Sequence, residues 1–483
     1  MTFTQSLDKI YGPRIKFSND LKGFYMSVYV NRTLNMKKIK AIGFDMDYTL
    51  VRYKTEAFEK FVFELVLKKL VDVKNYPKEV TELKFDFNQV IQGLIIDRLR
   101  GNILQTNRYG KVKIAKHGTK PMDFHDQNEI YGNSIIDLNS DQYQSLDTNF
   151  SISNGTMFAN LVDLKDQGMK LPDYETLSHD IKEVIDIAHS DNSLKGYVEE
   201  HLEDFIIKDP EVAKLLERFK RFGKKLILIT NSEWSWTKRL MEYTINPFLK
   251  EHETWTDLFD ISICLACKPR FFNVSNMFLE IQTDTGLMTN AEGPLEQNKV
   301  YQGGWAGKLQ KDLGLEGEEI LYLGDHIYGD VLTLKKTFNW RTALILDPLE
   351  AEIEAIRQST PTQALIDAEM EQKEKLEHEL NKLELLKHED PEKYNKEDIG
   401  KIFSEIDKIN SKISHHLDTY RQFFNAHWGE MMRAGLEESR FADQVEKYAC
   451  FYMAKITDLL EYTPRTYFRP KKRILAHEDS TML

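Results

Sequence analysis

The chain has 483 residues, which is too long for one ordinary domain, so we expect two or three structural units. Hydrophobic residues make up 41% of it, enough for sizeable cores, and the formal net charge is −12. That charge argues against a nucleic-acid polymer as the main ligand, although a small anion can bind at a local site of opposite charge.

The number of cysteines and the absence of long apolar runs indicate the cellular compartment of the protein. Three cysteines, Cys264, Cys267 and Cys450, are too few for a disulfide framework and are typical of a reducing compartment. The Cys264-x-x-Cys267 spacing admits zinc or redox chemistry, but no second pair accompanies it, so we favour two small residues on a buried strand. No membrane-spanning run or signal-peptide pattern is present, and we expect a soluble, cytoplasmic protein.

The first strand that we predict is the apolar run at residues 41–44, which leads directly into Asp45 and Asp47. About 170 residues separate this strand from the next, far more than a βαβ crossover needs. We expect this stretch to form an inserted domain that covers a cleft. It should begin with an amphipathic helix over residues 56–73, pass through an irregular aromatic stretch, and end with helices near 174–188 and 194–206.

Further short apolar runs follow the insertion, and helical stretches lie between them. These runs end at or just before polar residues, namely Thr230, Asn231, Lys268, Asp325 and Asp347. Strands that alternate with helices predict an α/β fold with a doubly wound, mostly parallel sheet. Because the carboxyl ends of parallel strands meet at one edge of the sheet, the polar residues there should converge on Asp45.

Past residue 350 the sequence becomes dense in Glu and Lys, with apolar residues at helical spacing on both sides of Pro391. We interpret this stretch as a C-terminal helical hairpin with a solvated surface, and self-association through it is the alternative. The expected divisions are an N-terminal segment with the first strand (1–58), the inserted cap domain (59–206), the core (207–350), the hairpin (351–425), and a C-terminal helical segment and tail (426–483).

The two acids of the first strand suggest catalysis. Asp45 and Asp47 stand two residues apart at a strand exit, which suits a nucleophile and a proton shuttle. The pattern alone is weak, because a turn with an Asx cap has the same spacing. Asp325 and Asp330 add carboxylates that would repel the first pair unless a divalent cation lay among them, and hard oxygen ligands favour Mg²⁺.

Three residues at other strand ends could bind an anion. Thr230 and Asn231 offer a hydroxyl, an amide and backbone N–H groups, and Lys268 offers a compact positive charge. A nucleophile, an acid/base, a cation and a metal site together predict phosphoryl transfer through an aspartyl-phosphate.

The motifs carry a resemblance. "DMDYTL", "TNS", "KP" and "GDHIYGD" resemble, in order, the four motifs of the haloacid dehalogenase (HAD) superfamily of phosphatases. The longer strings "IKAIGFDMDYTLVRY", "KPRFF" and "ILYLGDHIYGDVL", with "WRT" after the last, are similar to the cytosolic purine 5′-nucleotidase family, which prefers IMP and GMP. The similarity runs from Val30 to Leu346 and continues more weakly through the C-terminal helices.

The resemblance implies a HAD-like core and magnesium-dependent hydrolysis of purine nucleoside 5′-monophosphates. It implies that Asp45 is the nucleophile, that Asp47 is the acid/base, and that Thr230, Asn231 and Lys268 bind the phosphate. It also implies that Mg²⁺ is coordinated by Asp45, Asp325 and the backbone carbonyl of Asp47. Asp330 would support the water shell of the metal or orient Lys268. It also implies phosphoryl transfer to nucleoside acceptors, response to a nucleotide effector, and homo-oligomers. Lys335 and Lys336 could belong to an effector site, although a solvated helix face is the stronger reading.

Base recognition should come from the insertion. Helical spacing puts Lys182, Asp186 and His189 on one stripe, where they can hydrogen-bond a purine edge or simply face solvent. The resemblance favours the first reading, because the family's base-contacting segment covers Asp186, His189 and Lys195. It also implies that Phe150 stacks on the base.

Two positions depart from the family pattern. Lys182 stands where the family has arginine, and Asp147 stands where it has asparagine. A site rejects the wrong base by leaving buried polar groups unpaired, so both departures bear on base selectivity.

Two other functions stay open. One is a phosphatase of the same chemistry that acts on another small phosphate ester. The other is a nucleotide-binding regulatory or scaffold protein that uses the hairpin and has no need of Asp45.

Overall fold

The computed structural model describes residues 27–393 and 395–470. The first 26 residues of the expected N-terminal segment and residues 471–483 of the expected tail lie outside the described residues. Within the described part of the chain, no helix combines the length and the apolar character that crossing a membrane requires.

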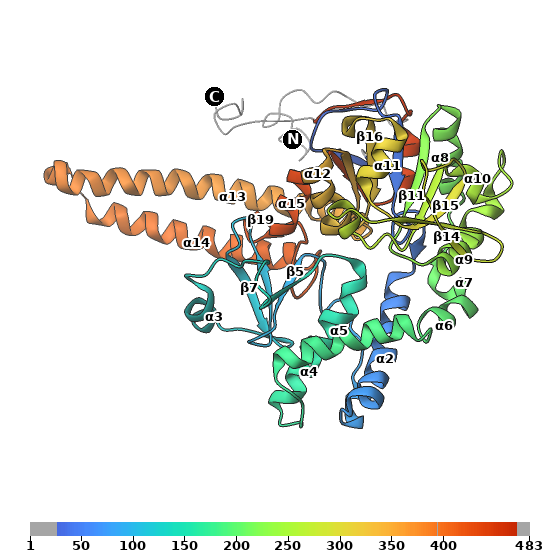
Figure 1. The fold of residues 1–483 in the computed structure, drawn as a ribbon. Coiled ribbons are helices and arrows are strands. Elements are labelled where there is room, and N and C mark those ends of the chain that lie inside the picture. Colours follow the sequence, from blue (N-terminus) through green and yellow to red (C-terminus); the bar gives the residue numbers. More distant parts are fainter. Residues whose placement is uncertain (1–26, 394, 471–483) are drawn as a thin grey trace.

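A ten-stranded sheet forms the centre of the molecule and confirms the expected doubly wound, mostly parallel architecture (Figure 1). Its order is β1 (Val28–Val30), β20 (Phe451–Met453), β17 (Arg341–Ile345), β16 (Ile320–Gly324), β3 (Ala41–Phe44), β11 (Lys225–Ile229), β12 (Ile261–Cys264), β15 (Lys299–Gly303), β13 (Phe278–Ile281) and β14 (Met288–Asn290). The strands from β20 to β15 are parallel, and β1, β13 and β14 are antiparallel at the two edges.

Helices cover both faces of this sheet, which explains why the strands are apolar throughout. On one face, Phe44 packs with Phe219 of α8 (Pro210–Arg221), a helix that begins at the Asp209 cap. On the other face, Ala41 belongs to a core that includes residues of α11 (Ala306–Leu313) and α12 (Thr333–Phe338). The central strand β3 is therefore buried along its whole length.

Gly43 of β3 allows a close approach between neighbouring strands. A Cβ atom at this position would lie 2.7 Å from the ring of Tyr322 in β16. The glycine thus lets the Tyr322 ring lie across β3, with its hydroxyl donating to the carbonyl of Ile229 at 3.0 Å.

The insertion has its own antiparallel sheet, where the sequence suggested only irregular structure. Its order is β8 (Lys120–Pro121), β7 (Val112–His117), β6 (Asn102–Thr106), β5 (Leu94–Asp97) and β9 (Tyr143–Leu146). The alternation of apolar and polar residues is weak here, because β5 and β6 are buried throughout. The sequence pattern therefore did not predict these strands.

Helices complete the cap. The structure confirms the helices expected near residues 56–73 and 174–188 as α2 (Thr55–Lys74) and α5 (Tyr174–Ser190). The helix expected over 194–206 is divided into α6 (Lys195–Glu200) and α7 (Leu202–Phe205). The chain enters and leaves the cap through two short antiparallel strands, β4 (Arg52–Tyr53) and β10 (Ile206–Ile207), which form a hinge ribbon.

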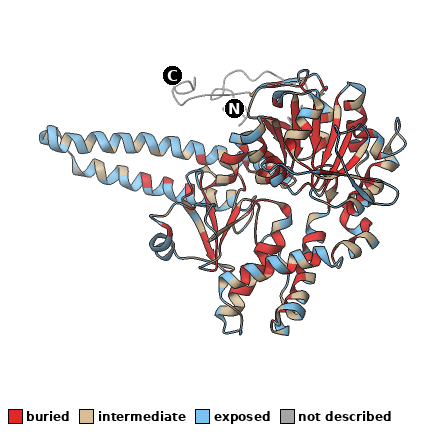
Figure 2. Ribbon diagram, in the orientation of Figure 1, coloured by how far each residue is buried: buried red, intermediate tan, exposed pale blue. Residues whose placement is uncertain are grey.

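The hairpin is also confirmed. Helices α13 (Leu349–Glu389) and α14 (Lys396–Arg421) pack along each other and project from the body of the molecule as a mostly exposed arm (Figures 1 and 2).

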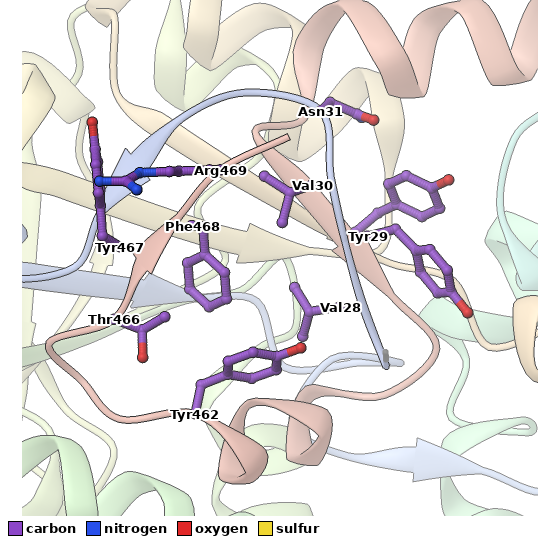
Figure 3. Close-up of a pocket in the computed structure, with 10 residues that line it drawn as sticks. Val28, Tyr29, Val30, Asn31, Tyr462, Thr466, Tyr467, Phe468 and Arg469 are labelled. Atoms are coloured by element: carbon purple, nitrogen blue, oxygen red, sulfur yellow. The ribbon is translucent and has the colours of Figure 1, made fainter. Parts of the chain in front are cut away.

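A cavity of about 460 Å³ lies at the β1 edge of the central sheet (Figure 3). Aromatic side chains such as Tyr29, Tyr462 and Phe468 line it. None of the motif residues reaches this cavity, so it is separate from the candidate active site.

Candidate active site

The two motif acids follow the central strand. Strand β3 continues into Asp45 through a bond from its N–H to the carbonyl of Leu323 at 2.9 Å. The chain then turns sharply, since Tyr48 has the left-handed φ of 55°. Asp45 is 8% exposed, so its carboxylate is largely shielded from solvent.

Lys268 lies directly beside Asp45. Its Nζ is 2.8 Å from Oδ1 of Asp45 and 2.7 Å from Oδ1 of Asp330, and it donates to the hydroxyl of Tyr322 at 3.1 Å. The backbone of Lys268 is held by the Asn231 carboxamide, which accepts from the Lys268 N–H at 2.6 Å and donates to the Lys268 carbonyl at 3.1 Å. The Asn231 side chain, expected to bind phosphate, is therefore engaged in fixing the lysine loop.

Three buried carboxylates share this site. Oxygen atoms of Asp45, Asp325 and Asp330 all lie within 4.8 Å of one another. Burial raises the pKa of Asp45 to about 7, although the charge of Lys268 opposes the shift. Burial raises the pKa of Asp325 well above its ordinary value, and the neighbouring carboxylates add to the effect.

This donor set fits a divalent cation. One lysine faces three carboxylates in a buried space, so the site holds an excess of negative charge that a hard cation would balance. Among the described residues, these three form the sole group of acids, histidines and cysteines with metal-ligand spacing. Cys264 is buried and Cys267 is exposed, and neither belongs to such a group.

Asp47 is held by two hydroxyl groups from different parts of the molecule. The Tyr53 phenol in the hinge ribbon donates to Oδ1 at 2.6 Å, and the Ser232 hydroxyl donates to Oδ2 at 2.7 Å. Ser232 also donates its N–H to the hydroxyl of Thr230 at 3.0 Å, and Thr230 is fully buried. Each carboxylate oxygen of Asp47 thus accepts a hydrogen bond from a different part of the molecule.

Three of the residues that we expect to recognise the base lie on helix α5 of the cap. Lys182, Asp186 and His189 are exposed on α5. The surrounding protein lowers the pKa of His189, and the nearby Lys195 charge adds to this, while Asp47 acts in the opposite direction. The charge of Asp47 therefore reaches His189 at this end of α5.

Lys195 and Phe150 connect the cap to the core. Lys195 Nζ lies 2.9 Å from Oε1 of Glu233, the residue after Ser232. The Phe150 ring is 38% exposed and packs edge-to-face against the rings of Tyr48 and Tyr53, with centroids 4.6 and 5.6 Å apart. Phe150 therefore presents a partly free ring beside the catalytic motif.

Asp147 is buried and accepts a hydrogen bond from the Ser145 hydroxyl. Burial raises the pKa of its carboxyl group above the ordinary value, and the Ser145 hydrogen bond opposes the shift. Lys335 and Lys336, expected on a solvated helix face, lie on α12, where Lys335 donates to Asn339 at 3.2 Å and Lys336 lies 5.5 Å above the Tyr448 ring.

Sequence reasoning missed three residues that hold the site together: Tyr53, Ser232 and Tyr322. Ser232 and Tyr53 stand next to motif residues, in "TNS" and "VRY", so their position in the sequence was a usable signal. Tyr322 lies within an apolar strand, and only the gap above Gly43 reveals why its hydroxyl reaches Lys268.

The parallel sheet, its cap and the order of the four motifs agree with the expected haloacid dehalogenase-type architecture, and the class of protein is a phosphoric monoester hydrolase. The family follows from the comparison with known proteins. The model of the 5′ nucleotidase family matches residues 28–480, and the chain belongs to that family.

One relative and two solved structures illustrate the likeness. A 5′-nucleotidase domain-containing protein of Dictyostelium discoideum is 26% identical over 458 residues, which cover 93% of this chain and 74% of that protein. A predicted phosphoglycolate phosphatase from Haemophilus somnus is 15% identical, with 64% of this chain and 85% of that chain covered and a TM-score of 0.28. A HAD phosphatase from Thermococcus onnurineus is 15% identical, with 64% and 87% covered and a TM-score of 0.25. The assignment to the 5′ nucleotidase family rests on the family match over residues 28–480.

Proposed function

We propose that this chain hydrolyses purine nucleoside 5′-monophosphates, with IMP and GMP preferred, through an aspartyl-phosphate on Asp45. The observation that carries the proposal is the cluster at the end of β3. There the Asp45 carboxylate lies 2.8 Å from the Lys268 ammonium and beside the carboxylates of Asp325 and Asp330. A family of 5′-nucleotidases and this arrangement point to the same chemistry.

In the proposed first step, an oxygen of Asp45 attacks the substrate phosphorus and forms the acyl phosphate. Asp47 protonates the departing ribose oxygen, so the nucleoside leaves as a neutral alcohol. Lys268 and the Thr230 hydroxyl bind the phosphoryl oxygens and offset their charge.

In the second step, Asp47 takes a proton from a water molecule, which attacks the phosphorus and releases inorganic phosphate from Asp45. The side chains of Asp45 and Asp325, with the backbone carbonyl of Asp47, would hold Mg²⁺, which supplies electrostatic stabilisation of the transferring group. Asp330 contacts Lys268 directly, which supports its role in orienting that lysine.

Recognition of the base is proposed for the cap. The Phe150 ring would stack on the purine, while Asp186, His189 and Lys195 would meet its polar edge. Lys195 already pairs with Glu233, so base binding there would exchange one partner for another. Lys182 and Asp147, the two departures from the family pattern, are the positions where selectivity between purines is most open to change.

Phosphate release from IMP, GMP, AMP and ribose 5-phosphate, with Mg²⁺ and with EDTA, tests the proposal. We expect the fastest release from IMP or GMP, dependence on Mg²⁺, and loss of activity in Asp45→Asn. Faster release from a sugar phosphate would favour the alternative, a phosphatase for another small ester. An Asp45→Asn variant with every property of the parent would favour a nucleotide-binding regulatory protein.

A further inference from the structure

Tyr53 touches three parts of the molecule that a nucleotidase must coordinate. Its backbone lies in the hinge ribbon, where it pairs with Ile206. Its hydroxyl donates to Oδ1 of Asp47 at 2.6 Å, and its ring meets the Phe150 ring at a centroid distance of 5.6 Å. One side chain therefore connects the hinge, the acid/base and the ring expected to stack on the base.

The ring of Tyr53 has little freedom to move by itself. It is 3% exposed and packs on Tyr48 at 4.9 Å and on Phe58 of α2 at 5.0 Å. Phe150 closes the same cluster from the cap, at 5.7 Å from Phe58. Because a packed aromatic cluster has few alternative arrangements, a shift of Phe150 has to be transmitted to its neighbours.

The two hydrogen bonds that Asp47 accepts come from different parts of the fold, the core and the ribbon that leads into the cap. Ser232 belongs to the loop after β11, which is part of the core, so its bond to Asp47 involves no residue of the cap. Tyr53 lies on the strand that leads into the cap, so its bond joins Asp47 to the ribbon through which the cap is attached. The orientation of the Asp47 carboxylate is thus the point where cap position can act on proton transfer.

We propose that Tyr53 is a positioning residue that couples occupation of the base site at Phe150 to the orientation of Asp47. This inference rests on the proposed function, since it takes a nucleotide base as the ligand of Phe150. A base stacked on Phe150 fixes the aromatic cluster, the cluster fixes the Tyr53 phenol, and the phenol holds Asp47 toward the leaving oxygen. A substrate without a base gains less from this chain of contacts.

The test compares Tyr53→Phe with wild type on IMP and on ribose 5-phosphate, with kcat and KM measured for each. The variant keeps the ring that touches Phe150 and removes only the hydrogen bond to Asp47. We expect kcat for IMP to fall about 10-fold or more, because small losses of orientation have large effects on reaction rates. The KM for IMP should change little, and kcat for ribose 5-phosphate should fall several-fold less.

Tyr48→Phe is the matched control. Tyr48 lies in the same cluster and is equally buried, but its hydroxyl makes no hydrogen bond to Asp47. It should keep wild-type kcat ratios, and thermal melting of both variants checks that each is folded.

Three results overturn the proposal: a wild-type kcat in Tyr53→Phe, an equal loss on both substrates, or the same loss in Tyr48→Phe. Failure of the proposed function looks different, because the wild type itself would then prefer an ester other than a purine nucleotide. In that case the kcat of Tyr53→Phe on the preferred ester still decides whether Tyr53 positions Asp47.

Discussion

The ammonium group of Lys268 lies 2.7 Å from Oδ1 of Asp330, a residue 62 positions later in the chain, and both side chains are buried. The same nitrogen lies 2.8 Å from Asp45. One cation is therefore shared by two acids from different strand ends. Because charges are costly to bury without partners, the fold depends on this lysine as much as the chemistry does.

Replacement of Lys268 by methionine keeps an unbranched side chain and removes the charge. We expect the free energy of unfolding to fall by about 3–5 kcal/mol, because the buried acids lose their counter-charge, and phosphate release to fall to background. Urea denaturation and a phosphate assay measure the two effects. Lys299→Met is the control, since the partly exposed pair of Lys299 with Glu280 should contribute far less to stability than the buried cluster does. Equal stability losses in the two variants would contradict the expectation.

Asp325→Asn should separate stability from metal binding. Neutralising one of three crowded carboxylates relieves repulsion, so we expect the metal-free variant to melt at a higher temperature than metal-free wild type. Mg²⁺ at 100 times its Kd should stabilise the wild type by about 2.7 kcal/mol and the variant far less. Melting curves in EDTA and in Mg²⁺ measure both effects without any substrate. A variant that gains as much from Mg²⁺ as wild type would remove Asp325 from the metal site.

The convergence of polar residues at the strand ends could be predicted because it follows from topology. Apolar runs that stop at Asp45, Thr230 and Asp325 imply parallel strands with a shared edge, and the structure brings their ends together. The hairpin could be predicted because the helical spacing of its apolar residues is a local property of the sequence. These features depend on order along the chain and not on the packing of particular side chains.

What the sequence could not provide depends on contacts between distant side chains. The sequence predicts Asn231 as a phosphate ligand, but it does not reveal the two hydrogen bonds between the Asn231 carboxamide and the Lys268 backbone. The sequence also does not show that the Asp147 carboxylate is buried and accepts a hydrogen bond from Ser145. The cap sheet escaped prediction because its central strands are buried on both faces and show no alternation.

Glu59 predicts a pH-dependent stability. Its carboxyl group is fully buried, Oε2 accepts the Ser153 N–H at 2.7 Å, and Oε1 has no partner. Burial raises its pKa from 4.5 to about 7. The folded state therefore binds this proton more tightly than the unfolded state, so the contribution is fully present below pH 4.5 and is lost as the pH rises to about 7.

Glu59→Gln keeps an acceptor for Ser153 and removes the titration. Relative to wild type, the variant should gain up to about 3 kcal/mol in unfolding free energy between pH 4.5 and pH 8. Urea denaturation at intervals of pH measures the difference. Glu56→Gln, an exposed change on the same helix, should show no such trend. A constant difference between Glu59→Gln and wild type at every pH would refute the assignment.

Phe150→Ala tests the base-stacking role. Stacking of a base on an aromatic side chain contributes about 1–3 kcal/mol, so KM for IMP should rise by roughly 5- to 150-fold. Ribose 5-phosphate has no base, and its KM should change much less. Phe150→Leu controls for the packing against Tyr48 and Tyr53, because it keeps apolar bulk and removes the aromatic face. An equal rise in KM for both substrates would assign Phe150 a purely structural role.

Asn231→Ala distinguishes two roles for this residue. If its carboxamide chiefly fixes the lysine loop, the variant displaces Lys268 from its position 2.8 Å from Asp45. The Lys268 charge stabilises the transition state more than the bound substrate. Its displacement should therefore lower kcat by about 10- to 100-fold with a small change in KM. If the carboxamide instead bound the substrate phosphate equally in both states, KM would rise while kcat stayed unchanged. Steady-state kinetics with IMP decide between the two, and the paired hydrogen bonds to the Lys268 backbone favour the first.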